Sequence, residues 1–307
     1  MNHPIHHGFE GAGLTSTRAF AHAKLNLVLR VLAREASGFH GIETLFQALE
    51  LADVVDVTIA EHERTLHCDG PAMPSGGLGP QDDNLATRAA VAYAAAARWE
   101  TGWNIAIDKN IPVGGGLGGG SADAAAVLRA FETLSPAPLG TSALMELAGT
   151  LGSDVPFLVS GAPLAWAWNR GDRLLPFTPL PRMEVVLATF VDGVNTGRAY
   201  AELAREAVSA VQYPTDAFGS WSSIVGLAHN DFESVVPSMH AGVAHWLGVV
   251  KQVARRMNAE GLPAIGLMSG SGATCFVLGA PGRIPELGSG AGMRAIKTHT
   301  LTTVATF

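Results

Sequence analysis

The sequence predicts an α+β protein with two domains. Its 307 residues are 48% hydrophobic and only 15% charged, so the chain can bury a large core, and its length suggests two domains. Strand and helix patterns mix without a regular βαβ repeat. Three prolines within residues 176–181 mark a boundary, so we expect one domain over residues 18–178 and a second over 179–307.

The first part of the chain begins with a strand over residues 19–32, because its side chains alternate. One face would carry Ala23, Leu25, Leu27 and Leu29, and the other Lys24, Asn26, Val28 and Arg30. Two further strands, a helix and another strand are expected over residues 42–51, 54–60, 84–99 and 103–108. Thr141 and Ser142 cap a short helix that ends at Leu147, and residues 152–156 open another turn or helix.

The second part predicts an antiparallel sheet with helices. A strand over residues 184–190 is followed by a helix after Thr196 and a long helix over 241–258. The remaining strands are expected over residues 264–268, 274–278 and 295–304.

Residues 111–126 join a glycine-rich stretch to a strong helix former. Glycines let the main chain approach an anion and adopt positive φ, and the N–H groups at a helix N-terminus bind negative oxygens. A flexible linker is the alternative. The leading Ile111-Pro112, the internal Leu117 and the amphipathic helix that follows favour a phosphate site.

Two familiar phosphate motifs do not account for this loop. Gly114, Gly116 and Gly119 have G-x-G-x-x-G spacing, but Glu132, about 20 residues on, lies within the predicted helix instead of ending a second strand. The loop also lacks the Lys-Ser/Thr ending of a P-loop. We therefore expect a different nucleotide-binding architecture.

Composition limits the partners and the compartment. A formal charge of −7 without a Lys/Arg cluster argues against nucleic acid. No stretch reaches the roughly 18 apolar residues of a membrane span, and residues 1–17 lack a signal-peptide pattern, so we expect a soluble protein with a disordered extension. Cys68 and Cys275 could pair, but their spacing favours a reducing, cytoplasmic setting. The eleven histidines show no metal-binding spacing, so we expect no structural metal.

Three motifs in order resemble the GHMP kinase superfamily, which includes galactokinase, homoserine kinase, mevalonate kinase and phosphomevalonate kinase. They are the P-x-x-x-G-L-G pattern and its helix over residues 112–126, Ala-Lys-Leu-Asn-Leu over 23–27, and the glycine motif over 266–274. The resemblance implies a two-domain GHMP kinase fold. A mixed-sheet N-terminal domain would carry the glycine loop and helix, and the C-terminal domain would combine an antiparallel sheet with helices.

Finer features are similar to the superfamily members that phosphorylate a cytidine diphosphate-linked polyol in the non-mevalonate isoprenoid pathway. These features lie at residues 38–40, 43–47, 114–121, 151–157 and 230–233. The resemblance implies ATP and the polyol as ligands, Mg²⁺ as cofactor, and a monomer or homodimer. Another small-molecule kinase, of the homoserine or mevalonate type, and a non-catalytic binding module of the same fold remain open.

The resemblance also implies roles for individual residues. Asp154 matches the catalytic aspartate, which would act as the base, and Lys24 matches the lysine that would stabilise the developing alkoxide. The ATP site would comprise Asn84, Lys109, Pro112, Gly114, Gly115, Gly116, Leu117, Gly118, Gly119, Gly120, Ser121 and Asp123. The substrate site would comprise Asn26, Phe39, His40, Phe46, Tyr200, Ser269, Gly270, Ser271 and Gly272.

The residues alone allow plainer interpretations. Asp154 and Asn84 could be helix caps, Lys24 could lie on a solvated strand face, and Tyr200 could be an ordinary surface residue of a helix. Residues 269–272 could form a simple hairpin. Gly119 and Gly120 stand where most members of the superfamily, other than those that phosphorylate the cytidine diphosphate-linked polyol, have two serines, so the groups that hold Mg²⁺ stay unassigned.

Overall fold

The computed structural model describes residues 15–34, 40–203, 211, 213–214, 216–288, 290 and 292–303. Ser16 and Thr17, which we expected in a disordered extension, are the first residues of a strand. The rest of that extension, apart from Thr15, lies outside the described residues, as do Phe39 and Val304. Both cysteines are free thiols, so the pairing of Cys68 with Cys275 is not formed.

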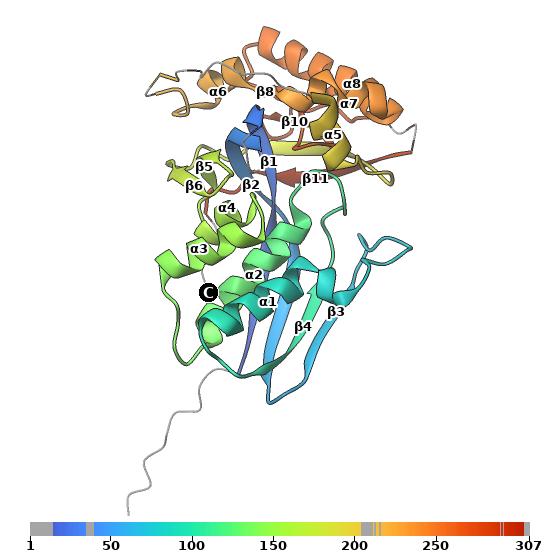
Figure 1. Cartoon of the computed structure of the whole chain (residues 1–307). Helices are drawn as coiled ribbons and strands as arrows, with labels where there is room; N and C mark the ends of the chain where they lie inside the picture. Colours follow the sequence, from blue (N-terminus) through green and yellow to red (C-terminus); the bar gives the residue numbers. More distant parts are fainter. Residues whose placement is uncertain are drawn as a thin grey trace, which may run out of the picture.

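The described strands form two sheets, which confirms the α+β class (Figure 1). The larger sheet has the order β3-β4-β2-β1-β8, with β5 paired to β2 and β6 to β5. It is mixed, because β3 pairs with β4 and β1 with β8 in parallel while its other pairs are antiparallel. Its strands are β1 (Ser16–Arg34), β2 (His40–Ala60), β3 (Arg64–Asp69), β4 (Gly102–Asp108), β5 (Leu164–Asn169), β6 (Arg173–Pro176) and β8 (His229–Asn230).

The smaller sheet is antiparallel throughout, in the order β11-β7-β10-β9. Its strands are β7 (Glu184–Phe190), β9 (Ile265–Met268), β10 (Cys275–Gly279) and β11 (Met293–His299). Alternate side chains of β7 enter two different cores, as a period of two residues requires. Val185 and Leu187 join the core of the larger sheet, whereas Val186 and Ala188 pack in the core beneath α8.

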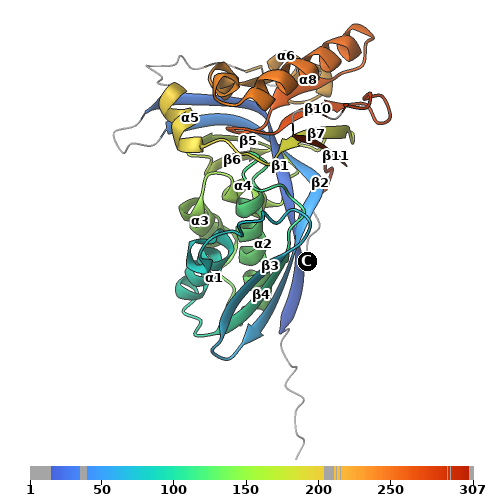
Figure 2. The same cartoon turned by 90° about the vertical axis from the view of Figure 1, so that its right-hand side faces the viewer.

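Helices cover both sheets (Figure 2). On one side of the larger sheet lie η1 (Gln81–Asp83), α1 (Leu85–Ala96), α2 (Gly119–Leu134), α3 (Thr141–Leu151) and α4 (Val155–Ser160). The later part contains α5 (Thr196–Leu203), α6 (Trp221–Leu227), η2 (Asp231–Ser234), α7 (Val236–Met239) and α8 (Ala241–Ala259), which packs on β9 and β10. Within the described ranges, no helix is long and apolar enough to cross a membrane.

The strands predicted over 42–51 and 54–60 are one strand, β2. Asp53 lies in the interval between the two predicted strands, and a buried carboxylate is rare unless it is paired. Asp53 is indeed fully buried, but it accepts hydrogen bonds from Lys109 and from the backbone N–H groups of Asn110 and Ile111. The strand therefore continues through a paired charge.

The predicted faces of β1 are also wrong in part. Lys24 and Asn26 are as buried as the apolar side chains beside them, because this strand is covered on both sides. The register against β2 shifts between Asn26 and Val28, and such a shift changes the phase of the alternation. Leu29 consequently lines the same cavity as Lys24 and Asn26, instead of facing away from them.

Other elements differ at their ends. The helix predicted to stop at Leu147 continues to Leu151, because Leu144, Ala148 and Leu151 form its buried face, and Gly140 takes the N-cap position. The strand predicted over 295–304 is β11, which is shorter and ends at His299. Strands β3, β5, β6 and β8 and helices α6 and α7 were not predicted.

A cluster of rings packs around Phe131 of α2. The ring lies 5.7 Å from Tyr93, 5.9 Å from Trp99 and 5.5 Å from Trp103, each contact edge to face, and Phe131 is fully buried. The cluster joins α1, α2 and β4, and it therefore supports the helix that follows the glycine loop.

Replacing Phe131 should be costly. We expect Phe131→Ala to lower the free energy of unfolding by about 3–5 kcal/mol, because it leaves a cavity among three rings. Urea unfolding measures this loss. The control is Val91→Ala at a half-exposed position of α1, which should change stability by less than about 0.5 kcal/mol. Similar losses for the two variants would contradict the role of the cluster.

Candidate active site

A cavity of about 670 Å³ lies between the two parts of the chain. This volume is within the range of small-molecule sites. Most of the site residues predicted from the sequence line it, and they come from β1, the glycine loop, α2, the start of α4, α5 and the turn before β10. They are Lys24, Asn26, Asn84, Lys109, Pro112, Gly114, Gly115, Gly116, Leu117, Gly118, Gly119, Gly120, Ser121, Asp123, Asp154, Tyr200, Gly270, Ser271 and Gly272.

The glycine loop leads directly into the N-terminus of α2. Gly114, Gly116 and Gly118 have φ of 74°, 76° and 75°, a region that favours glycine. Gly118 is the N-cap, and no side chain caps the helix. The first backbone N–H groups of a helix have no partner within it, so here they can bind anionic oxygens, as the loop pattern predicted.

The loop is held in place by the rest of the chain, so the linker interpretation is wrong. Leu117 is buried, and its carbonyl accepts a hydrogen bond from the Lys24 backbone N–H at 2.9 Å. The Gly115 carbonyl accepts from the Thr274 N–H at 3.1 Å. The Gly116 carbonyl accepts from the Ser269 hydroxyl at 2.9 Å. The turn between β9 and β10 thus holds the glycine loop through the carbonyls of Gly115 and Gly116.

Lys24 sits at the centre of the cavity wall. Its ammonium donates to Asn26 Oδ1 at 2.7 Å and to the Gly116 carbonyl at 3.1 Å, and it lies 3.2 Å from Asp154 Oδ2. Lys24 is only 3% exposed, so it does not lie on a solvated strand face. The register of β1 shifts on either side of Lys24 and Asn26, and such irregularities re-aim side chains.

Asp154 occupies the N-cap position of α4 but makes no capping hydrogen bond with its side chain. The carboxylate instead approaches Lys24. Its side chain is 26% exposed, against 4% for that of Lys24, so a ligand in the cavity can reach it. The capping interpretation of Asp154 is therefore wrong.

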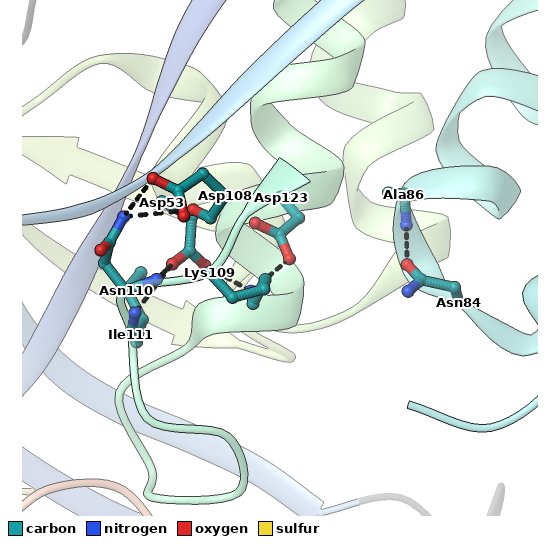
Figure 3. A network of polar contacts seen from close by, with 8 residues as sticks. All are labelled: Asp53, Asn84, Ala86, Asp108, Lys109, Asn110, Ile111 and Asp123. Atoms are coloured by element: carbon teal, nitrogen blue, oxygen red, sulfur yellow. Dashed lines mark hydrogen bonds and ion pairs between the residues drawn. The ribbon is translucent and has the colours of Figure 1, made fainter. Parts of the chain in front are cut away.

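Asn84 combines both interpretations that the sequence allowed. Its side-chain oxygen caps α1 by accepting from the Ala86 N–H at 2.9 Å, as Figure 3 shows, and the residue also lines the cavity.

Two aromatic side chains, Tyr200 and Phe232, also line the cavity. Tyr200 stacks on His40, with ring centroids 5.3 Å apart and planes at 27°, and meets Phe232 edge to face at 4.9 Å. Burial, together with the charge of Asp154, raises the pKa of Tyr200 to about 12, so its hydroxyl stays protonated. Tyr200 is not the ordinary surface residue that its helix alone allowed.

Known proteins resemble the chain over most of its length. Residues 84–162 match the GHMP kinases N terminal domain. The 4-diphosphocytidyl-2-C-methyl-D-erythritol kinase of Paracoccus denitrificans is 35% identical over 85% of this chain and 86% of its own length. That of Syntrophotalea carbinolica is 36% identical over 83% of this chain and 87% of its own.

The chain belongs to the 4-diphosphocytidyl-2-C-methyl-D-erythritol kinase family. A crystal structure of 4-(cytidine 5'-diphospho)-2C-methyl-D-erythritol kinase is 33% identical and has a TM-score of 0.68, covering 92% of this chain and 99% of the other. The GHMP kinase fold and the assignment as an ATP-dependent small-molecule kinase are thereby confirmed.

Three residues expected at the substrate site of this kinase lie outside the lining of the cavity. Phe46 is fully buried and stacks on Phe157 beneath the Lys24 ammonium, so it packs the floor of the site. Ser269 is also buried and supports the loop through Gly116. His40 lies behind Tyr200 and outside the lining of the cavity. Phe39 is outside the described residues.

Sequence reasoning missed the side chains that support this kinase site from behind. Asn230 donates to the carbonyls of Met268 and Gly270 at 2.7 and 2.8 Å, which ties β8 to the turn before β10. Thr196 and Ser271 share a hydrogen bond of 2.8 Å between their hydroxyls. The Asn-Asp-Phe-Glu segment at 230–233 is one of the features that resemble the polyol kinases, but nothing in the sequence indicates that Asn230 binds the backbone near residue 270.

Gly116 gives a direct test of how closely the two loops must approach. A Cβ at this position would overlap the Ser269 carbonyl oxygen, and the φ of 76° adds strain of about 1–2 kcal/mol. We expect Gly116→Ala to displace the loop and weaken Mg-ATP binding by at least about tenfold, measured by calorimetry.

The matched control is Gly282→Ala, which has a φ of 70° but no atom within 4 Å of the added Cβ. It should carry the strain alone and leave nucleotide affinity unchanged. Wild-type affinity in Gly116→Ala would show that the contact between the loops is dispensable.

Proposed function

We propose that this kinase transfers the γ-phosphoryl group of ATP to the 2-hydroxyl of 4-diphosphocytidyl-2-C-methyl-D-erythritol, a step of the non-mevalonate isoprenoid pathway. The observation that carries the proposal is the Lys24–Asp154 pair, 3.2 Å apart, in the cavity that the N-terminus of α2 also lines. A base, a cation and an anion site within one cavity are the parts that phosphoryl transfer to an alcohol requires.

In the proposed reaction, Asp154 accepts the proton of the substrate hydroxyl. The oxygen then attacks the γ-phosphorus, and the bond from phosphorus to the β–γ bridging oxygen breaks, releasing ADP. Lys24, held by Asn26 and the Gly116 carbonyl, stabilises the negative charge on the attacking oxygen and the transferring group. The N–H groups at the start of α2 hold the other phosphates.

Mg²⁺ would supply charge neutralisation at the phosphates. Ser121 and Asp123 line the cavity within the first two turns of α2, and Asp123 Oδ1 is a buried oxygen without a hydrogen-bond partner. Hydroxyl and carboxylate oxygens suit Mg²⁺, which commonly takes one or two protein ligands beside phosphate oxygens. These two residues fit the ion and would hold it.

The cytidine end of the substrate is proposed to lie beside Tyr200. A cytosine ring offers a π-face and a donor and acceptor edge, which suit the ring of Tyr200, supported from behind by His40, and the amide of Asn26. The role of Phe39 at this end stays a prediction. Of the alternatives, the homoserine and mevalonate types would not need this aromatic group.

Removing the base tests the mechanism. We expect Asp154→Asn to fold but to lose turnover by about 10²- to 10⁴-fold, because the amide keeps the shape and removes the proton acceptor. ADP release is measured with Mg-ATP and the cytidylyl polyol, with homoserine and mevalonate tested beside it. Glu146→Gln on the exposed face of α3 is the control. Turnover near the wild-type rate in folded Asp154→Asn would reject the assigned base.

Tyr200 tests which substrate the site accepts. If the ring stacks on cytosine, Tyr200→Ala should raise KM for the cytidylyl polyol by about 5- to 150-fold, the equivalent of about 1–3 kcal/mol. KM for ATP should change little, and Tyr200→Phe should be tolerated. Equal increases of both KM values would indicate that Tyr200 only packs against Phe232, and would remove the aromatic argument for cytidine.

A further inference from the structure

Three charged side chains form a buried network beside the glycine loop (Figure 3). The Lys109 ammonium donates to Asp53 Oδ2 and, at 2.5 Å, to Asp123 Oδ2. Asp53 is 0% exposed, and Lys109 and Asp123 are each 2% exposed. Taking such charges out of water is costly, so the network needs a physical reason.

The network joins the entry of the loop to its exit. Asp53 Oδ1 accepts hydrogen bonds from the backbone N–H groups of Asn110 at 2.5 Å and Ile111 at 2.7 Å, the residues that lead into the loop. Asp123 belongs to the first two turns of α2, just after the loop ends. Lys109 connects the two, so β2, the entry and the exit are bound through three side chains.

Charge attraction to ATP does not explain this arrangement. Two carboxylates and one ammonium carry a net negative charge, so the network does not itself attract phosphates, and at most Asp123 is accounted for by Mg²⁺. The contacts themselves connect backbone segments, which indicates a geometric role.

We propose that Asp53 is a positioning residue for phosphoryl transfer, which holds the entry and exit of the glycine loop together so that the phosphate-binding N–H groups are arranged before ATP binds. The inference rests on the proposed function for the assignment of this loop to ATP. Preorganised donors bind more tightly because ordering them costs nothing when the ligand arrives. Asp53 itself touches no ligand in this scheme, and it acts through Lys109 and the two backbone amides.

Asp53→Asn is the decisive variant. It leaves Lys109 and Asp123 as a balanced ion pair, so the protein should still fold, but it removes the charge that binds the ammonium to β2. We expect KM for ATP to rise about 10- to 100-fold, the range for losing charge-assisted hydrogen bonds, with KM for the cytidylyl polyol unchanged. In nucleotide-free protein, amide hydrogen exchange over residues 112–121 should become faster.

The control is Asp56→Asn, three residues further along the same strand, where the carboxylate forms an exposed pair with Arg18. It should alter neither KM nor the exchange of the loop. If Asp53→Asn does not fold, Asp123→Asn leaves the Asp53–Lys109 pair balanced and cuts the link at the exit. Faster exchange of the loop in that variant supports the proposal, and unchanged exchange overturns it.

Two outcomes with folded Asp53→Asn would overturn the inference. One is unchanged KM for ATP together with unchanged exchange of the loop. The other is an equal rise of KM for both substrates together with a smaller fraction of active enzyme, which a purely structural role of Asp53 would produce. Failure of wild-type protein to bind Mg-ATP would instead refute the proposed function. The exchange measurement distinguishes the cases, because it needs no nucleotide.

Discussion

The arrangement of this site depends on one buried ammonium group. Lys24 is almost fully removed from water, and a buried charge is tolerated only when partners surround it. Those partners come from distant parts of the chain: Asn26 from the same strand, the Gly116 carbonyl from the glycine loop and Asp154 from the start of α4. The need to satisfy Lys24 therefore brings the proposed base and the phosphate loop to one point.

The second constraint is the close approach of two backbone turns. The Gly116 carbonyl accepts from both Lys24 and Ser269, and a side chain on Gly116 would overlap the main chain of the second turn. Asn230 holds that turn from the other side. The glycine loop belongs to the first part of the chain, but its position depends on the second, so the cavity requires both.

The cavity divides by chemistry. Part of its lining consists of the backbone of the glycine loop and the first turn of α2, whose N–H groups suit phosphates. Another part consists of the rings of Tyr200 and Phe232, which suit a flat base. The Lys24–Asp154 pair lies in the same wall, which would place the transferred group and the accepting hydroxyl beside one cation.

By itself the sequence determined the α+β class and the glycine loop with its helix, because glycine conformation, helix periodicity and strand alternation are local properties. Most of the other residues that line the cavity were named through the resemblance of sequence motifs to the GHMP kinases. The sequence did not reveal that β2 is continuous, since Asp53 becomes compatible with a buried strand only when Lys109 and two backbone amides meet it. Nor could the sequence decide whether Lys24 is solvated or buried, or whether the Asp154 side chain caps α4 or approaches Lys24. Those choices depend on partners more than 90 residues away, and only the tertiary structure brings them together.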